Sequence, residues 1–265
     1  MAKNQGTETA ARVADVLLLF TDGPTSLGVS AIARELNLSK AVVHRILQTL
    51  VDRLLLSPDP GTRGYRIGPA AAAFGARALR ECELRTVAMP VLRDLQRTTG
   101  ETTTVSALVP GGRVYLDQVT STREIKMTVE VGRRFPLHAG SSSTCMLAFL
   151  PASQQEDVLR GALRALTSVT VTNRDALRLR LSETRRLGVA QSVGERQEGA
   201  GSVAAPVFRF DGEVLGAVSV CGPAARVDAE ARNRFVPLLR EAADAVSRAM
   251  GWRGGLPSES GLVRT

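Results

Sequence analysis

The chain has 265 residues, of which 44% are hydrophobic, and its formal net charge is +8. A sequence of this length and composition supports one large or two ordinary globular domains, and its positive charge favours a polyanionic partner. No run of about 18 apolar residues occurs, and Arg12 and Asp15 interrupt the apolar part of the N-terminus, so we expect a cytoplasmic protein without a membrane span or signal peptide.

The first 80 residues are rich in positive charge and show a helical pattern. They contain ten Lys and Arg against six Asp and Glu, so their net charge of +4 equals that of the other 185 residues. Apolar residues between Val13 and Phe20 recur at helical spacing before a turn, and a second short helix is expected over residues 29–36. Ser39 is a favourable N-cap for a third helix. Three closely spaced helices predict a helix-turn-helix.

The third helix lies within the stretch NLSKAVVHRILQTL, residues 37–50. Helical spacing predicts a buried face formed by the apolar residues Val43, Ile46, Leu47, Leu50 and Leu54. The opposite side carries Ala41, Arg45 and Gln48, and its flanks carry Val42 and His44. This polar and basic side is expected to face solvent or an anionic partner.

The segment that follows is typical of a wing and a linker helix. LLLS, PDPGTRG and YRIG read as strand, turn and strand, with proline and glycine supplying the turn. The Ala-rich stretch that begins at Pro69 is expected to form a helix. We therefore place a winged helix-turn-helix domain at residues 8–68 and a linker helix at residues 69–82.

The remaining sequence predicts an α+β domain over residues 83–251. Two hairpins are expected, TTTVSALV with RVYLDQV and VAAPVF with VLGAVSV, and EIKMTVEV is expected to be a further strand. Helices are expected from Leu84 to Gly100, after Thr172 or Asn173, and over a long stretch near the C-terminus. Strands flanked by helices favour a sensor-like α+β module. Residues 252–265 are expected to be a disordered tail.

Three stretches resemble the IclR family of bacterial transcriptional regulators. They are LGVSAIARELNLSKAVVHRILQTL with GYRIG, then GRRFPLHAGSSSTCMLAFLP, and finally AAPVFRFDGEVLGAVSVCGPAARV. Their order and spacing cover about residues 10 to 250. The resemblance implies an N-terminal winged helix-turn-helix, a C-terminal effector-binding domain of GAF-like fold, and homodimers or homotetramers on double-stranded operator DNA. Repression is the commoner mode of action in this family.

The resemblance places the third helix in the major groove of DNA. The expected DNA-binding residues on that helix are Ser39, Lys40, Ala41, Val42, His44 and Arg45, and those on the wing are Arg63 and Arg66. Arg45 matches the arginine of the family's "HR" pair and can read guanine bidentately, while the wing arginines can reach phosphates. Val42 departs from the hydroxyl residue of many relatives. Its side chain can contact a thymine methyl but cannot donate a hydrogen bond.

The second domain is expected to bind a small-molecule effector, often an organic or aromatic acid in this family. PLHAGSSSTCMLAFL reads as a loop that enters a helix, and free backbone N–H groups at such a point favour an anion. The resemblance nominates Ser141, Ser142, Ser192, Ser202, Ser219 and Cys221 as effector-binding residues. Two departures leave the effector open: Ser143-Thr144 replaces a common Gly-Lys, and Ser192 replaces an acid found in some relatives.

Two other functions compete with ligand sensing. The serines near His138 could belong to a serine-dependent hydrolase, but no G-x-S-x-G motif accompanies them. Cys145 or Cys221 could act as a thiol-based redox sensor. The three cysteines form no C-x-x-C pair. The chain has only two histidines. We expect no metal, no cofactor and no enzymatic activity.

Overall fold

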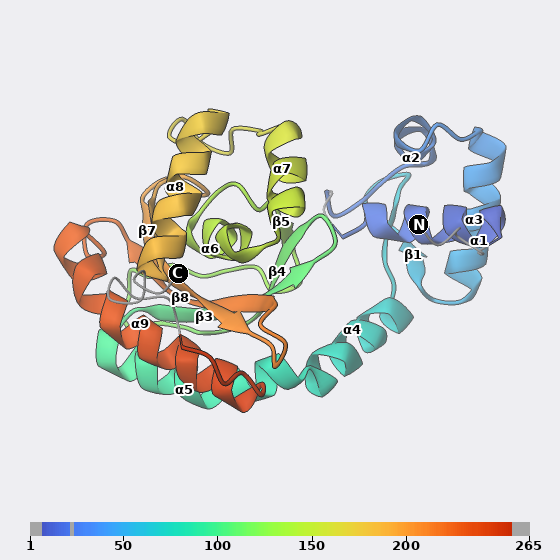
Figure 1. The fold of residues 1–265 in the computed structure, drawn as a ribbon. Coiled ribbons are helices and arrows are strands. Elements are labelled where there is room, and N and C mark those ends of the chain that lie inside the picture. The colour runs from blue at the N-terminus through green and yellow to red at the C-terminus, as the bar shows by residue number, and fades with distance from the viewer. Residues whose placement is uncertain (1–6, 22–23, 256–265) are drawn as a thin grey trace. The chain divides into compact units, whose positions relative to one another are not determined.

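The computed structural model describes residues 7–21 and 24–255 (Figure 1). The chain divides into two compact units, Met1–Glu81 and Cys82–Thr265, called here the N-terminal and C-terminal units. None of the helices in the described part of the chain is long and apolar enough to cross a membrane. Of the expected disordered tail, residues 256–265 lie outside the described residues, and residues 252–255 belong to no helix or strand.

The N-terminal unit contains the expected three helices, a two-stranded wing and a further helix. Their bounds are α1 (Glu8–Leu19), α2 (Val29–Glu35), α3 (Lys40–Asp52), β1 (Leu56–Pro58), β2 (Tyr65–Ile67) and α4 (Pro69–Glu81). β1 and β2 are antiparallel, with Leu56 opposite Ile67. The winged helix-turn-helix expected from the sequence is therefore confirmed.

The buried face of α3 fixes which of its side chains remain outside. Val43 and Leu47 are fully buried and pack in one cluster with Val16 of α1 and Ile32 of α2. The expected burial of Leu54 is wrong, because its side chain is 57% exposed. α3 ends at Asp52, and Leu54 adopts a left-handed backbone with φ 57°, so helical spacing does not extend to this residue.

The C-terminal unit is built on a six-stranded sheet with the order β5-β4-β3-β8-β7-β6, in which neighbouring strands are antiparallel. The strand bounds are β3 (Thr102–Val109), β4 (Gly112–Val119), β5 (Arg134–Phe135), β6 (Ala190–Val193), β7 (Ala200–Phe208) and β8 (Val214–Pro223). The two expected hairpins correspond to β3–β4 and β7–β8. β3 of the first hairpin pairs with β8 of the second, and this pairing joins the two hairpins into one sheet.

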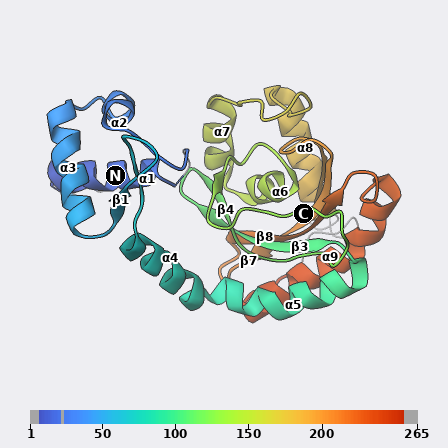
Figure 2. The ribbon, with the colours of Figure 1, turned by 180° about the vertical axis from the view of Figure 1, so that it is seen from behind.

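Helices lie on both faces of this sheet (Figures 1 and 2). Their bounds are α5 (Glu83–Thr99), α6 (Ser141–Phe149), α7 (Ala152–Arg160), α8 (Arg174–Leu187) and α9 (Ala229–Ala249). α5 and α9 contact each other and the sheet on one face, whereas α6 contacts β7 and β8 on the other face and packs against α8. The expected α+β architecture is confirmed.

One expected strand is absent. Residues 124–131, all within the described part of the chain, form no strand. The backbone of this segment bonds to side chains instead. Thr102 Oγ1 donates to the Met127 carbonyl at 2.7 Å. The side-chain amide of Gln118 donates to the Val129 carbonyl and accepts from the Val129 N–H, both at 2.9 Å. The elements β5, β6 and α7 were not expected from the sequence.

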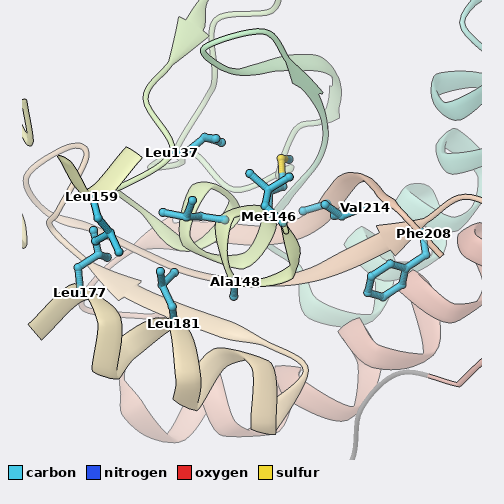
Figure 3. Packing of buried hydrophobic residues seen from close by; sticks show 11 residues of the cluster. Leu137, Met146, Ala148, Leu159, Leu177, Leu181, Phe208 and Val214 are labelled. Atoms are coloured by element: carbon cyan, nitrogen blue, oxygen red, sulfur yellow. The ribbon is translucent and has the colours of Figure 1, made fainter. Parts of the chain in front are cut away.

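An apolar cluster holds α6 in place between α8 and the sheet (Figure 3). Its labelled members are Leu137, Met146, Ala148, Leu159, Leu177, Leu181, Phe208 and Val214. Met146 is fully buried, and burying a side chain of this size stabilises the fold by roughly 1.5–3 kcal/mol. Because this cluster anchors the body of α6, the helix presents its N-terminus at a fixed position in the C-terminal unit.

Candidate functional site

The first candidate site is the outer face of α3. Ser39 caps the helix, and its hydroxyl accepts a hydrogen bond from the Val42 N–H at 3.3 Å. Lys40, Ala41, His44 and Arg45 are exposed, whereas Val42 is half-buried. Within the described residues, the side chains of Lys40, His44 and Arg45 make no ion pair or hydrogen bond with the protein. These donors remain available to a partner.

The wing adds two exposed arginines, Arg63 in the turn and Arg66 on β2. Asp59 orders the turn, because its carboxylate accepts hydrogen bonds from Thr62 Oγ1 at 2.8 Å and from the Gly61 N–H at 3.1 Å. These two bonds, the first above all, lower the pKa of Asp59. The wing is thus held by local polar contacts, and its two arginines make no hydrogen bond or ion pair with the described residues, so they are available to bind an anion.

The second candidate site is a polar cavity of about 30 Å³ in the C-terminal unit. It lies among the N-terminus of α6, the β6–β7 loop and strands β4, β7 and β8. Its lining is rich in serines, glycines and charged residues. The lining residues are Arg113, Tyr115, Gly140, Ser141, Ser142, Ser192, Gly194, Glu195, Arg196, Gln197, Ala200, Ser202 and Ser219.

Five of the six nominated effector residues line this cavity, namely Ser141, Ser142, Ser192, Ser202 and Ser219. The Ser141 hydroxyl donates to that of Ser202 at 2.8 Å, and Ser219 shares a hydrogen bond with Thr104 Oγ1 at 2.7 Å. Cys221 is buried beside Ser202 in the β7–β8 register but does not line the cavity. The structure thus brings five nominated residues together, and their role in binding stays a prediction.

Arg113 is a lining residue that the sequence analysis missed. Its side chain is 1% exposed, although arginine is among the residues least often fully buried. The guanidinium donates from Nε to Ser143 Oγ at 2.7 Å, and from its terminal nitrogens to Ser106 Oγ and Tyr115 OH, both at 3.1 Å. Strand alternation puts Arg113 and Tyr115 on the same face of β4, and this pattern could have predicted that Arg113 is buried beside Tyr115.

The N-terminus of α6 opens onto the same cavity. Its N-cap, Gly140, has φ 85° and no side chain to cap the helix. The first helical hydrogen bond runs from Thr144 N–H to the Gly140 carbonyl. The backbone N–H groups of Ser141 to Ser143 therefore precede the helical ladder, and such groups attract an acceptor or an anion.

The contacts of His138 and the cysteines do not support the two competing functions. His138 Nε2 lies 2.9 Å from the Arg164 carbonyl, while the Ser141 hydroxyl bonds to Ser202. Burial raises the pKa of Cys221 to about 11 and raises that of Cys145 still further, so both thiols are protonated near neutrality. Neither an activated serine nor an activated thiolate is found among these residues.

A larger and more apolar groove, of about 650 Å³, lies elsewhere in the C-terminal unit. It includes Leu108, Pro136 and Leu163, with His138 and Asp157 among its polar members. It contains no arginine or lysine. The cationic and N–H groups that favour an anion converge in the smaller cavity instead.

Two family models match the chain. The IclR helix-turn-helix domain matches residues 9–60, and the bacterial transcriptional regulator IclR C-terminal domain matches residues 76–248. The chain belongs to the IclR family. The glycerol operon regulatory protein of Streptomyces griseus is 34% identical to this IclR-family protein over 95% of the chain and 98% of the relative.

Solved structures of IclR-family proteins have the same fold. A transcriptional regulator from Silicibacter sp. TM1040 is similar with a TM-score of 0.82 and 31% identity, over 92% of this chain and 97% of that one. An IclR homologue from Microbacterium hydrocarbonoxydans, solved in complex with 4-hydroxybenzoate, is similar with a TM-score of 0.71 and 28% identity. The similarity covers 92% of this chain and 99% of the homologue. The protein is therefore an IclR-family transcriptional regulator with a DNA-binding helix-turn-helix domain.

Proposed function

We propose that this IclR-family regulator is a repressor whose affinity for operator DNA is changed by a small anionic or hydroxylated organic metabolite. DNA binding is supported by the exposed basic side chains on α3, above all Lys40 and Arg45, which have no partner among the described residues. In a helix-turn-helix domain such a helix enters the major groove and its N-terminal residues contact base edges. Arg63 and Arg66 of the wing contact phosphates, which position the domain without reading sequence.

The effector binds in the polar cavity of the C-terminal unit. The N-terminus of α6 receives its negative end, and the lining serines orient it. The complex of the M. hydrocarbonoxydans homologue with 4-hydroxybenzoate supports an organic acid as the ligand class. Because coupling between two sites is reciprocal, operator DNA shifts effector affinity by the same factor by which effector shifts operator affinity.

The repressor acts in the cytoplasm as a homodimer or homotetramer and catalyses no reaction. One winged domain covers few base pairs, so a two-fold assembly on a palindromic operator doubles the specific contact. Relatives such as the glycerol operon regulatory protein of Streptomyces griseus are named as regulators, which supports a regulatory role over an enzymatic one. A hydrolase would require an activated serine, and the contacts of Ser141 and His138 provide none.

The test is to sequence the genomic DNA fragments that the purified protein retains, and then to compare variants on one recovered site. Arg45→Ala is expected to reduce discrimination between bases at one position by roughly 1–3 kcal/mol. The control is Arg77→Ala, since Arg77 is also exposed but pairs with Glu81 on α4. Unchanged base preference in the Arg45 variant would show that α3 does not read the operator.

A further inference from the structure

The cavity contains a buried positive charge that the protein does not neutralise. Arg113 takes part in none of the ion pairs within the described part of the chain, and its three hydrogen-bond partners are the neutral hydroxyls of Ser106, Tyr115 and Ser143. A guanidinium has five N–H groups. Three are used in these bonds, so each terminal nitrogen keeps one N–H for a further acceptor.

A second guanidinium lies against the same aromatic rings. The central carbon of Arg113 lies 4.3 Å from the ring centroid of Tyr115 and 5.2 Å from that of Phe135. The corresponding carbon of Arg196 lies 5.7 Å and 5.1 Å from these centroids. Burial, together with the nearby charge of Arg196, lowers the pKa of Arg113. The aromatic faces offset part of the free-energy cost of burying the Arg113 charge, but the guanidinium groups of Arg113 and Arg196 still repel each other.

The nearby carboxylates already have partners other than Arg113. Glu195 is the one acidic residue that lines the cavity. Its Oε1 lies 2.6 Å from an Arg180 guanidinium nitrogen, and its Oε2 accepts a weak hydrogen bond from the Gly140 N–H at 3.4 Å. Glu101, which is 2% exposed, pairs with Arg226 at 2.7 and 2.9 Å. The cavity therefore keeps an excess of positive charge, although buried charges in proteins are normally paired.

We propose that Arg113 is the anchor for a carboxylate group of the effector, which supplies the missing counter-charge. This inference rests on the proposed function of the cavity and narrows its ligand to a carboxylic acid. The carboxylate accepts from the two remaining N–H groups of Arg113 and from the first backbone N–H groups of α6, at Ser141 and Ser142. Arginine suits this role because its planar fork matches a carboxylate.

The size of the cavity indicates how a larger acid would be accommodated. About 30 Å³ holds roughly two water molecules, and hence little more than a carboxylate group. The β6–β7 loop, residues 194–199, borders the cavity and carries Arg196, which is half-buried. Glycines with φ near 70° stand at both ends of this loop, Gly194 and Gly199. A larger acid would therefore require Arg196 to move with this loop.

The test uses the intact protein and needs no knowledge of the natural effector. The melting temperature is measured in formate, acetate and benzoate, each against its neutral amide, at an ionic strength held constant with the bulky sulfonate buffer MES. We expect the acids, and not the amides, to raise the melting temperature of the wild-type protein. Equal effects of acids and amides, or no effect of any acid beyond that of MES, would overturn the proposal.

Variants then assign the effect to Arg113. Arg113→Met is expected to weaken the binding of the stabilising acid by about tenfold or more, because a charge-assisted bidentate contact is lost. Arg113→Lys keeps the charge without the planar fork and is expected to bind with intermediate affinity. Arg93→Met, which removes an exposed arginine of α5, is the control and should bind as wild type. Undiminished acid binding by Arg113→Met would place the anchor elsewhere.

Two readouts separate this inference from the proposed function. Acid binding that depends on Arg113, combined with an unchanged operator affinity, would support the carboxylate anchor and contradict the switch. Operator affinity that responds to an acid in the Arg113→Met protein as strongly as in wild type would support the switch and contradict the anchor. If Arg113→Met fails to fold, the Arg113→Lys protein decides the proposal: acid binding as tight as in wild type would contradict a role for the planar guanidinium.

Discussion

Ser141 donates its hydroxyl hydrogen to the Ser202 hydroxyl at 2.8 Å, and this bond links the first residue of α6 to β7 at the polar cavity. The two residues are 61 positions apart in the sequence. A ligand that accepts the Ser141 hydroxyl hydrogen in place of Ser202 would break this link between α6 and β7.

The first prediction concerns the double variant Ser141→Leu, Ser219→Leu. Both serines line a cavity of about 30 Å³, so two leucines fill it and remove two hydroxyls. We expect the protein to lose its acid-dependent rise in melting temperature and its acid-dependent change in operator affinity. The matched control is Ser182→Leu on the exposed surface of α8. Acid binding retained by a folded double variant would move the effector site out of this cavity.

The N-terminal unit could be predicted because its signals are local. The Ser39 cap and the spacing of Val43 and Leu47 identify α3 and its outer face within a few residues of sequence. The helix end at Asp52 was missed, since the apolar residue Leu54 continues the spacing although the chain has already turned.

The cavity could be predicted only in part, because its decisive contacts are distant in the sequence. Glycine and serine before an apolar run indicated the start of α6, whereas Arg113, next to a Gly-Gly turn, resembled an exposed residue of a strand. Its burial depends on hydroxyls that lie 7 and 30 residues away, Ser106 and Ser143. Residues 124–131 have the composition of a strand, but their backbone bonds to side chains.

The second prediction separates phosphate contacts from base reading. Arg63→Ala and Arg66→Ala are each expected to weaken binding about equally on all DNA sequences, and to reduce the slope of log affinity against log salt by roughly 1. Arg45→Ala should instead change base preference. Filter binding or fluorescence anisotropy over a range of salt concentrations measures both effects. A sequence-dependent loss in the wing variants would contradict a phosphate role.

The third prediction concerns assembly. We expect at least a dimer in solution and on DNA. The operator should be an imperfect palindrome, because the two half-sites of the DNA match the two-fold symmetry of a protein dimer. Sedimentation velocity at micromolar concentration, with and without operator DNA, measures the mass of each species. A monomer under both conditions would rule out the two-fold arrangement.

The fourth prediction concerns the stability of the central sheet. A Cβ atom at Gly216 would lie 2.1 Å from the Ser106 carbonyl oxygen on the neighbouring strand. Gly216→Ala must push β8 away from β3, and we expect it to lower the free energy of unfolding by about 1–3 kcal/mol. Gly255→Ala is the control, because its Cβ meets nothing within 4 Å. Equal denaturation midpoints for the two variants would contradict the close approach of these strands.

The final prediction distinguishes a ligand sensor from a thiol sensor. Burial raises the pKa of Cys221 from its ordinary value of 9.0 to about 11, and the pKa of Cys145 is raised in the same direction. The neutral thiols are favoured in the folded protein, so the contribution of Cys221 to stability is complete below pH 9 and is lost as the pH rises through 11.

At pH 8 we therefore expect a thiol reagent to modify at most the half-buried Cys82 in the native protein, and all three cysteines after unfolding. Because thiolate is the reactive form, peroxide at this pH should leave operator affinity unchanged. Cys82→Ser removes the accessible thiol and should behave as wild type in DNA binding. Rapid modification of Cys221 in the native protein, accompanied by loss of operator binding, would instead favour a redox sensor.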